Sequence, residues 1–221
     1  MAAGAGRAVT KERGGSRYPV PAETTRVEMR VVNSRFIATI GQARTVEEAR
    51  AFIERIREEF RDATHNVYAF RVGYGPSVTE GMSDDGEPPG TAGRPALAVL
   101  RGADLGDVVL VITRYFGGTK LGTGGLVRAY TGAAQEALRA LRVVERVERR
   151  RGRINVPYSL YEPVRQAIIA AGGEIAGEEF AGEVTLKLTV PVGDIAGLEA
   201  ALAELSGGRL HVAWGEADQP S

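Results

Sequence analysis

The sequence DVVLVITRYFGGTKLGTGGLVRAY, residues 107–130, begins as an apolar run, continues into a glycine-rich loop and ends in an amphipathic pattern. This order predicts a buried strand, a loop, and a helix from about Gly125 to Leu141. Five of the nine residues from 117 to 125 are glycines. Glycine adopts positive φ and lets backbone N–H groups approach a ligand. Because the loop leads into a helix, free N–H groups and the positive end of the helix dipole should meet at one anion-binding position.

Two common nucleotide motifs do not describe this loop. Lys120 precedes Gly122, so the spacing is not that of a Walker A loop. Val127 stands where the dinucleotide fingerprint has its third glycine. What remains is a glycine nest with nearby basic and aromatic side chains, which suits phosphate, carboxylate or RNA contact, while a structural turn without a ligand is the alternative. The candidate anion- or RNA-binding residues are Arg114, Tyr115, Gly117, Gly118, Lys120, Gly122, Gly124, Gly125, Arg128 and Tyr130.

Length and composition favour a cytoplasmic protein of two domains. The chain has 221 residues, of which 43% are hydrophobic and 25% charged, as in ordinary soluble globular proteins. No apolar run approaches the roughly 20 residues of a membrane span, and the N-terminal residues show no signal-peptide core. There is no cysteine, and His65 and His211 are the two histidines, which excludes disulfides and disfavours a structural zinc site.

The charge is unevenly distributed along the chain. The net charge is +3 over residues 1–22, +3 over 23–151, −4 over 152–214 and −2 over 215–221. Residues 139–153 contain seven arginines. We therefore expect any nucleic-acid contact on the first part of the chain and its junction, although a solvated helix end rich in arginine explains the same run.

Residues 1–22 are predicted to form a disordered tail, and residues 23–142 a first domain of mixed α and β structure. Two β-rich runs on either side of Asn33 and Ser34 predict a hairpin. Thr45 and Glu48 have the spacing of a capping box before a helix. A long loop rich in Gly, Pro and Asp interrupts the domain, and loops of that length are often functional.

Residues 143–151 are predicted as a linker, residues 152–214 as a second domain, and residues 215–221 as a tail. The order of elements in the second domain is βαββαβ, a ferredoxin-like sandwich, with Asp194 as an N-cap. Its open sheet face would present Thr185, Lys187 and Thr189 without an aromatic platform. Together with the negative charge, this argues against that face as an RNA reader.

The acidic loop SDDGEPPG, residues 83–90, supplies a second group of candidates. Its carboxylates suit either Mg²⁺ binding or the capping of backbone N–H groups, and the turn signals favour capping. His65 is a candidate base or a hydrogen-bonding strut. No catalytic residue or reaction is assigned, and Mg²⁺ is the one cofactor considered. The candidates that order the loop or hold Mg²⁺ are His65, Asn66, Asp84, Asp85, Glu87 and Arg94.

Several longer runs resemble the YigZ/IMPACT family. They are ATHNVYAFRVG at 63–73, MSDDGEPPGTAGRP at 82–95, VITRYFGGTKLGTGGLVRAYTGAAQEAL at 111–138 and VPYSLY at 156–161. The resemblance implies a first β-α-β domain of the type shared by a ribosomal protein and domain IV of elongation factor G. It also implies a second domain like domain V of that factor. Eukaryotic members of the family compete for the activator of a kinase through an additional N-terminal domain, and that partner is not expected here because this chain has a short tail in its place.

These observations lead to an α+β protein with two domains and two rival functions. The first is a translation-associated regulator that binds RNA, the ribosome or a translation factor through the glycine-rich cleft of the first domain, without DNA specificity and without a membrane. The second is an enzyme or binder for a small phosphorylated or anionic metabolite in the same cleft.

Overall fold

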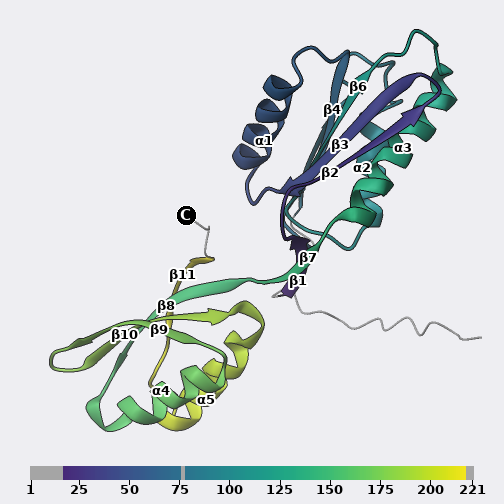
Figure 1. The fold of residues 1–221 in the computed structure, drawn as a ribbon. Helices are drawn as coiled ribbons and strands as arrows, with labels where there is room; N and C mark the ends of the chain where they lie inside the picture. The colour runs from purple at the N-terminus through teal and green to yellow at the C-terminus, as the bar shows by residue number, and fades with distance from the viewer. Residues whose placement is uncertain (1–16, 76–77, 218–221) are drawn as a thin grey trace, which may run out of the picture. The chain divides into compact units, whose positions relative to one another are not determined.

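The computed structural model describes residues 17–75 and 78–217 (Figure 1). Contacts divide the chain into two compact units, one from Tyr18 to Arg146 and a second that starts at Val147. Both units combine helices with a β-sheet, which confirms the predicted α+β class with two domains. Residues 1–16 and 218–221 of the two predicted tails lie outside the described residues.

The first unit is built on a five-stranded antiparallel sheet in the order β2-β3-β6-β4-β5. Its central strand, β6, is the buried strand predicted from the apolar run that begins at residue 107. Val108 to Arg114 are all buried. The predicted hairpin is present, with Val32 and Asn33 as its turn. The strands are β2 (Thr25–Val31), β3 (Ser34–Gln42), β4 (His65–Val72), β5 (Thr79–Ser83) and β6 (Val108–Tyr115).

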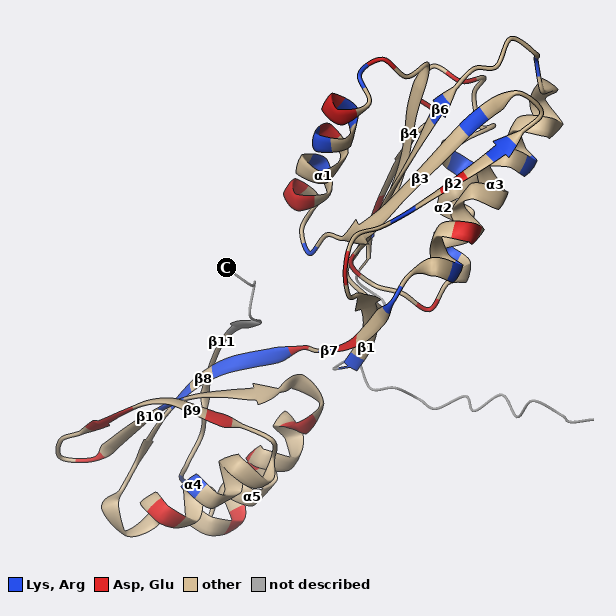
Figure 2. Cartoon of the chain, viewed as in Figure 1, with Lys and Arg blue, Asp and Glu red and all other residues tan. Residues whose placement is uncertain are grey.

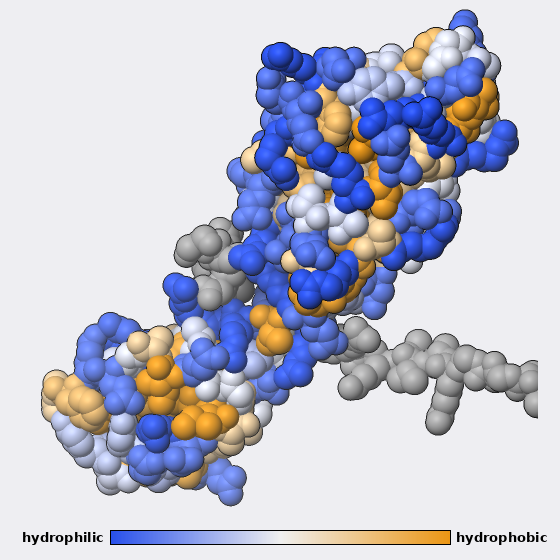
Figure 3. Space-filling model, in the orientation of Figure 1, coloured by the Kyte–Doolittle hydropathy of each residue, from blue (hydrophilic) through white to orange (hydrophobic). Residues whose placement is uncertain are grey.

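One face of this sheet is covered by α1 (Val46–Glu59). The helix begins as predicted, because Thr45 Oγ1 accepts a hydrogen bond from Glu48 N at 3.1 Å. Its apolar stripe, with Phe52 and Ile56, packs against alternate residues of β6 and β4. The outer side of α1 is hydrophilic (Figure 3), so the helix shields this face of the sheet from water.

The opposite face is covered by α2 (Gly93–Gly102) and α3 (Gly122–Ala140). The sheet therefore lies between two helical layers, with one apolar cluster on each side. This explains why β6 is apolar at successive positions and does not alternate. The larger cluster lies under α2 and α3, where the functional candidates are also found.

Two predictions about the ends of the first domain are wrong. Residues 17–21, assigned to the tail, form β1 (Arg17–Pro21), and residues 143–147, assigned to the linker, form β7 (Val143–Val147), its partner. Tyr18 is buried and donates a hydrogen bond to Asp107 Oδ2 at 2.9 Å. A five-residue strand with two prolines carries little periodic signal, and its pairing depends on a segment far away in the sequence.

The second unit has the order βαββαβ and the sheet order β11-β8-β10-β9, with antiparallel neighbours throughout. This is the predicted ferredoxin-like sandwich, with α4 and α5 on one face of the sheet. Its core joins Leu186 and Leu188 of the sheet to Ile168 and Leu198 of the helices. The elements are β8 (Arg149–Val156), α4 (Tyr161–Ala170), β9 (Glu174–Phe180), β10 (Val184–Pro191), α5 (Ile195–Ser206) and β11 (Ala213–Ala217).

Three details of the second unit differ from the prediction. Strand β8 begins at Arg149, inside the predicted linker, and β11 extends to Ala217, inside the predicted C-terminal tail. Asp194 occupies the N-cap of α5, but its side chain makes no capping hydrogen bond, because a 3-10 turn over Val192–Asp194 leads into the helix.

Across the described part of the chain, no helix is long and apolar enough to cross a bilayer.

Candidate anion-binding site

The glycine loop and the acidic loop meet at a cavity of about 440 Å³ beside the start of α3. Glu87 and Pro88 reach it from the acidic loop, and Lys120 and the first residues of α3 from the glycine loop. The two loops therefore converge, and Glu87 is the carboxylate of the acidic loop that lines the cavity. The lining residues are Thr64, His65, Glu87, Pro88, Arg114, Phe116, Lys120, Leu121, Gly122, Thr123 and Leu126.

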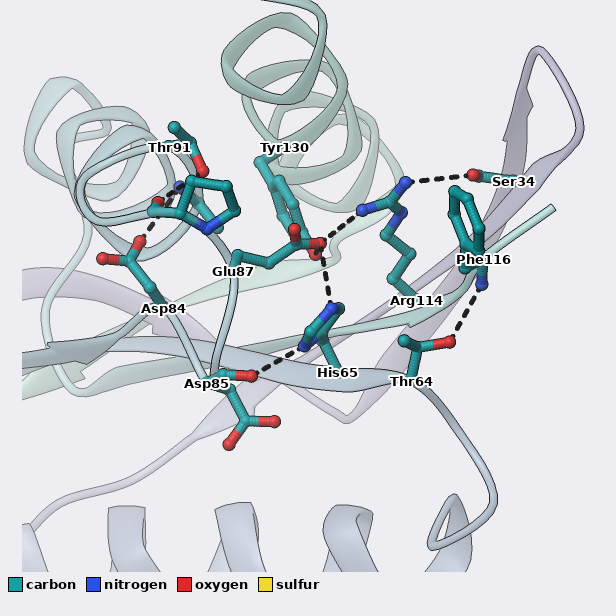
Figure 4. Close-up of polar contacts among 12 residues, drawn as sticks. Ser34, Thr64, His65, Asp84, Asp85, Glu87, Thr91, Arg114, Phe116 and Tyr130 are labelled. Atoms are coloured by element: carbon teal, nitrogen blue, oxygen red, sulfur yellow. Dashed lines mark hydrogen bonds and ion pairs between the residues drawn. The ribbon is translucent and has the colours of Figure 1, made fainter. Parts of the chain in front are cut away.

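Glu87 is the buried centre of the cavity wall (Figure 4). Its Oε1 accepts hydrogen bonds from Arg114 Nη1 and from the hydroxyl of Tyr130, both at 2.7 Å. Burial, followed by the bond to Glu87, raises the pKa of Tyr130, so its hydroxyl stays protonated and donates. Tyr130 is fully buried and therefore does not offer the RNA-stacking surface that we expected.

Arg114 was predicted to contact phosphate, but its guanidinium group mainly contacts other residues of the protein. Besides Glu87, it donates from Nη2 to Ser34 Oγ at 3.2 Å, and its guanidinium lies 5.5 Å from the ring centres of Phe36 and Phe116. Its Nε is buried and has no hydrogen-bond partner among the described residues. Arg114 therefore forms part of the cavity wall, and its Nε is a hydrogen-bond donor that no described residue uses.

His65 lies beside the carboxylate of Glu87 (Figure 4). Its Nδ1 lies 2.8 Å from the carbonyl oxygen of Asp85, and its Nε2 lies 3.8 Å from Glu87 Oε1. Because a carbonyl accepts and does not donate, Nδ1 carries the proton. The ring thus lies between the backbone of Asp85 and the carboxylate of Glu87, and it contributes to the lining of the cavity.

Asp84 and Asp85 do not line the cavity. Asp84 accepts hydrogen bonds from the backbone N–H groups of Gly90, Ala92 and Gly93 at 2.8–3.0 Å, and so caps the start of α2. Asp85 accepts from Asn66 N at 2.6 Å and from Arg57 Nη2 at 2.9 Å. Among residues 17–75 and 78–217 no three His, Asp or Glu side chains are placed to hold a metal ion. The hydrogen bonds that Asp84 and Asp85 accept from backbone N–H groups agree with the capping explanation of the acidic loop.

The capping role predicts a pH-dependent effect. Burial would raise the pKa of Asp84, but the three backbone N–H groups and the charge of Arg94 outweigh it and lower the pKa below its ordinary 3.8. A lowered folded-state pKa means that the stabilisation is present above the unfolded-state pKa and is lost as pH falls through the folded-state value. We expect Asp84→Ala to destabilise the protein by about 1–2 kcal/mol at pH 7.

Urea unfolding of wild type and Asp84→Ala at pH 7 and at pH 3 checks this expectation. The difference in unfolding free energy should narrow at pH 3, because this pH lies below the unfolded-state pKa of Asp84 and part of the stabilisation is then lost. Glu58→Ala is the control, since that side chain is 78% exposed and should matter little at either pH. A difference that is the same at both pH values would contradict the capping role.

Four other candidates lie away from the cavity. Tyr115 is on the sheet face that carries α1 and donates to Asp62 Oδ1 at 2.8 Å. Asn66 is buried and bonded to Thr113 and to the backbone of Phe60. Arg94 and Arg128 are exposed on α2 and α3 but do not line the cavity. These residues are close to the two loops in the sequence. The geometry of the strands and helices, however, points their side chains away from the cavity.

The predicted glycine loop is shorter than expected, because α3 begins at Gly122 and includes Gly124 and Gly125. Gly118 and Gly122 have φ of 81° and 70°, which other residues rarely adopt. The N-cap, Leu121, provides no side-chain hydrogen bond to the first turn. The backbone N–H groups at this end of a 19-residue helix are therefore not satisfied by a capping side chain, and exposed Lys120 lies beside them.

Sequence reasoning missed some lining residues and undervalued another. Thr64 Oγ1 accepts from Phe116 N at 3.0 Å, which connects the start of β4 to the glycine loop. Tyr115, Phe116 and Tyr130 were all candidates for base stacking, and of the three Phe116, 45% exposed, lines the cavity. Because successive side chains of an extended chain point to opposite sides, Phe116 could have been separated from Tyr115. Nothing in the spacing of Thr64 indicates the loop.

Comparison with known proteins agrees with this architecture. A family model described as the Impact N-terminal domain matches residues 32–138, and one described as a domain of unknown function (DUF1949) matches residues 154–209. The chain is 36% identical over 194 residues to "IMPACT family member YigZ" of Escherichia coli (strain K12), covering 87% of this chain and 95% of that protein. The chain belongs to the IMPACT family.

Other IMPACT relatives support the same assignment. An "IMPACT family member" of Haemophilus influenzae is 37% identical over 88% of this chain and 95% of its own length. A solved crystal structure of "an hypothetical protein" is 35% identical, covers 90% of this chain and 97% of that one, and superposes with a TM-score of 0.67. The resemblance inferred from the motif runs is therefore confirmed, together with the two-domain fold.

Proposed function

We propose that this IMPACT-family protein is a translation-associated regulator of the cytoplasm that binds RNA, free or within the ribosome, through the cavity beside the start of α3. The observation that carries the proposal is the meeting of uncapped N–H groups of α3, Lys120 and an exposed aromatic ring at one cavity. Phosphate accepts from free N–H groups at a helix start and is attracted by the dipole and by the ammonium group. Family membership supports the link to translation.

The shape and lining of the cavity suit one nucleotide of a strand. A phosphate would lie against the backbone of Gly122 and Thr123, and Lys120 would neutralise its charge. A base would stack on Phe116, because every base offers a π-face to an aromatic ring. His65 and Glu87 lie at the other wall, where a ribose hydroxyl can form hydrogen bonds with them. All the lining residues fall within the runs by which the chain resembles its family.

A small phosphorylated metabolite is the second candidate, and the size of the cavity favours it. A volume of about 440 Å³ lies within the range of ordinary small-molecule sites. The dependence of affinity on ligand length separates the two candidates. RNA should bind more tightly as the strand lengthens and should weaken steeply with salt, whereas a metabolite site should saturate with a mononucleotide.

Lys120→Ala should weaken binding of a single-stranded RNA oligonucleotide by about 1 kcal/mol or more. It should also lower the slope of log affinity against log salt by about 0.7, the value for one phosphate neutralised on a single strand. Fluorescence anisotropy at several salt concentrations measures both quantities. The fold should be unaffected, because the side chain is exposed.

Arg128→Ala is the matched control for this experiment. It also removes one exposed positive charge, from α3 and outside the cavity lining. We expect its salt slope to stay near that of wild type. Equal losses in both variants would indicate a general charge effect, and no change in Lys120→Ala would move the RNA-binding surface away from the cavity.

A further inference from the structure

The charges of the second unit are unevenly distributed over its elements. The helical layer carries acidic residues and β9 carries three more, whereas β8 carries a row of basic residues (Figure 2). The exposed acidic residues of the helical side are Glu162 on α4, Asp194 in the turn before α5, and Glu199 and Glu204 on α5. The negative net charge of this domain argued against RNA contact at the open face of its sheet. That net charge does not describe the open face itself.

The open face has a defined set of side chains because the register alternates. Leu186 and Leu188 of β10 enter the core, so the residues between and beside them face the other way. Opposite those positions on β8 are Arg151 and Arg153. A groove of about 710 Å³ follows this face, and its lining residues are Arg149, Arg151, Gly152, Arg153, Glu174, Ala176, Lys187, Leu188, Thr189, Ala213 and Gly215.

Positive charges outnumber negative charges in this groove. Among the residues whose side chains the structure describes, four basic residues line it, against Glu174 in the lining and Glu179 at its margin. Lys187 Nζ lies 2.6 Å from Glu179, and Arg149 Nη1 lies 3.0 Å from Glu174. Arg153 lies 4.0 Å from Glu179. Ion pairs between exposed groups contribute about 0–1 kcal/mol, so a polyanion with several phosphates can compete for these cations.

We propose that the open face of the sheet β11-β8-β10-β9 binds the sugar-phosphate backbone of double-helical RNA. Alternate arginines on β8 are about 6.7 Å apart along the strand, a spacing that can follow successive phosphates. Thr185, Thr189 and Asn155 add hydroxyl and amide groups to the same face, which can exchange hydrogen bonds with ribose 2′-hydroxyls. This surface is separate from the cavity beside α3.

The absence of aromatic side chains decides between double-helical and single-stranded RNA. Proteins that bind single strands stack bases on aromatic rings, whereas proteins that bind RNA duplexes contact phosphates and 2′-hydroxyls across the minor groove. Within the described residues, the aromatic side chains on the strands of this sheet, Phe180 and Trp214, lie on the helical side. Phe180 packs with Tyr158 and Tyr161, and Trp214 Nε1 donates to Glu199 of α5. The open face is therefore built for backbone contact.

The test is binding of the full chain to an RNA duplex of about 16 base pairs, long enough to present two minor grooves. The double variant Arg151→Ala/Arg153→Ala should raise the Kd for the duplex roughly tenfold and lower the salt slope by about 0.9 for each phosphate that is no longer neutralised. Arg165→Ala is the control, because it removes an exposed arginine from α4 on the helical side. Lys120→Ala should leave duplex affinity nearly unchanged.

The outcomes distinguish this surface from the cavity of the first domain. Loss of duplex binding in the β8 double variant, with single-strand binding retained, supports the proposal even if Lys120→Ala proves to have no effect. The proposal is overturned if the wild type does not bind the duplex, if the double variant matches the wild type, or if Arg165→Ala causes the same loss. Equal affinity for a DNA duplex of the same sequence would overturn the choice of RNA.

Discussion

Glu87→Ala is expected to lower the free energy of unfolding by about 3–5 kcal/mol, because it leaves a buried guanidinium without its counter-ion. Glu87 and Arg114 are both less than 10% exposed, and the same carboxylate oxygen also accepts the hydroxyl hydrogen of Tyr130. Removing the carboxylate therefore leaves one buried charge and one buried hydroxyl unsatisfied. Denaturation by guanidinium chloride, followed by circular dichroism, measures the loss.

Two further variants show whether the buried charge is the cause. Glu87→Gln keeps a hydrogen-bond acceptor but loses the negative charge, so its loss should be intermediate. Glu59→Ala removes a carboxylate that pairs with Arg26 at 2.5 Å but is 41% exposed, and it should lose about 1 kcal/mol at most. If Glu87→Ala were no more destabilising than Glu59→Ala, the buried ion pair would not support the cavity wall.

The second large effect is expected at Gly117. A Cβ at this position would lie 2.0 Å from the carbonyl oxygen of Asn33 and 2.1 Å from its carbonyl carbon. These are backbone atoms of the β2–β3 turn and cannot rotate away, so either the turn or the glycine loop must shift. Gly117→Ala should therefore destabilise the protein by about 3 kcal/mol or more. It should also weaken RNA binding, because the loop supplies the cavity wall.

Gly124→Ala is the matched control for Gly117→Ala. It adds the same methyl group, but Gly124 lies inside α3, and the new Cβ would be 3.6 Å from the guanidinium of Arg128, an ordinary contact. Alanine is favoured over glycine in a helix by about 0.5–1 kcal/mol, so this variant should be slightly more stable than wild type. Thermal melts of the two variants should show shifts in Tm of opposite sign. A stable Gly117→Ala protein would mean that the loop does not press against the turn.

The paired contacts of the cavity wall explain why these two positions should be sensitive. Ser34 Oγ accepts from both Arg114 Nη2 and Gly117 N, so the β2–β3 turn, the buried ion pair and the glycine loop share one hydrogen-bonded junction. A change in any of the three alters the position of the helix start. This hydrogen-bonded cluster therefore fixes the position of the loop and of the helix start at the candidate site.

Elements with a strong local signal could be predicted from the sequence. The spacing of apolar residues in α1, its Thr45 cap and the alternation in β10 each depend on neighbours within a few residues. The capping role of the acidic turn could also be predicted, because Asp and Gly at these positions favour capping of backbone N–H groups. The family resemblance rested on long continuous runs for the same reason.

The sequence by itself determined the α+β class, the ferredoxin-like second domain and the two loops that form the cavity, because these follow from local periodicity and turn chemistry. Tertiary structure alone decided that Arg114 and Tyr130 are buried on Glu87, that β1 pairs with β7, and that the open face of the second sheet is basic. Each of these depends on contacts between distant segments. A residue's type gives its chemistry, but its burial and its partner are set by which strand or helix packs beside it.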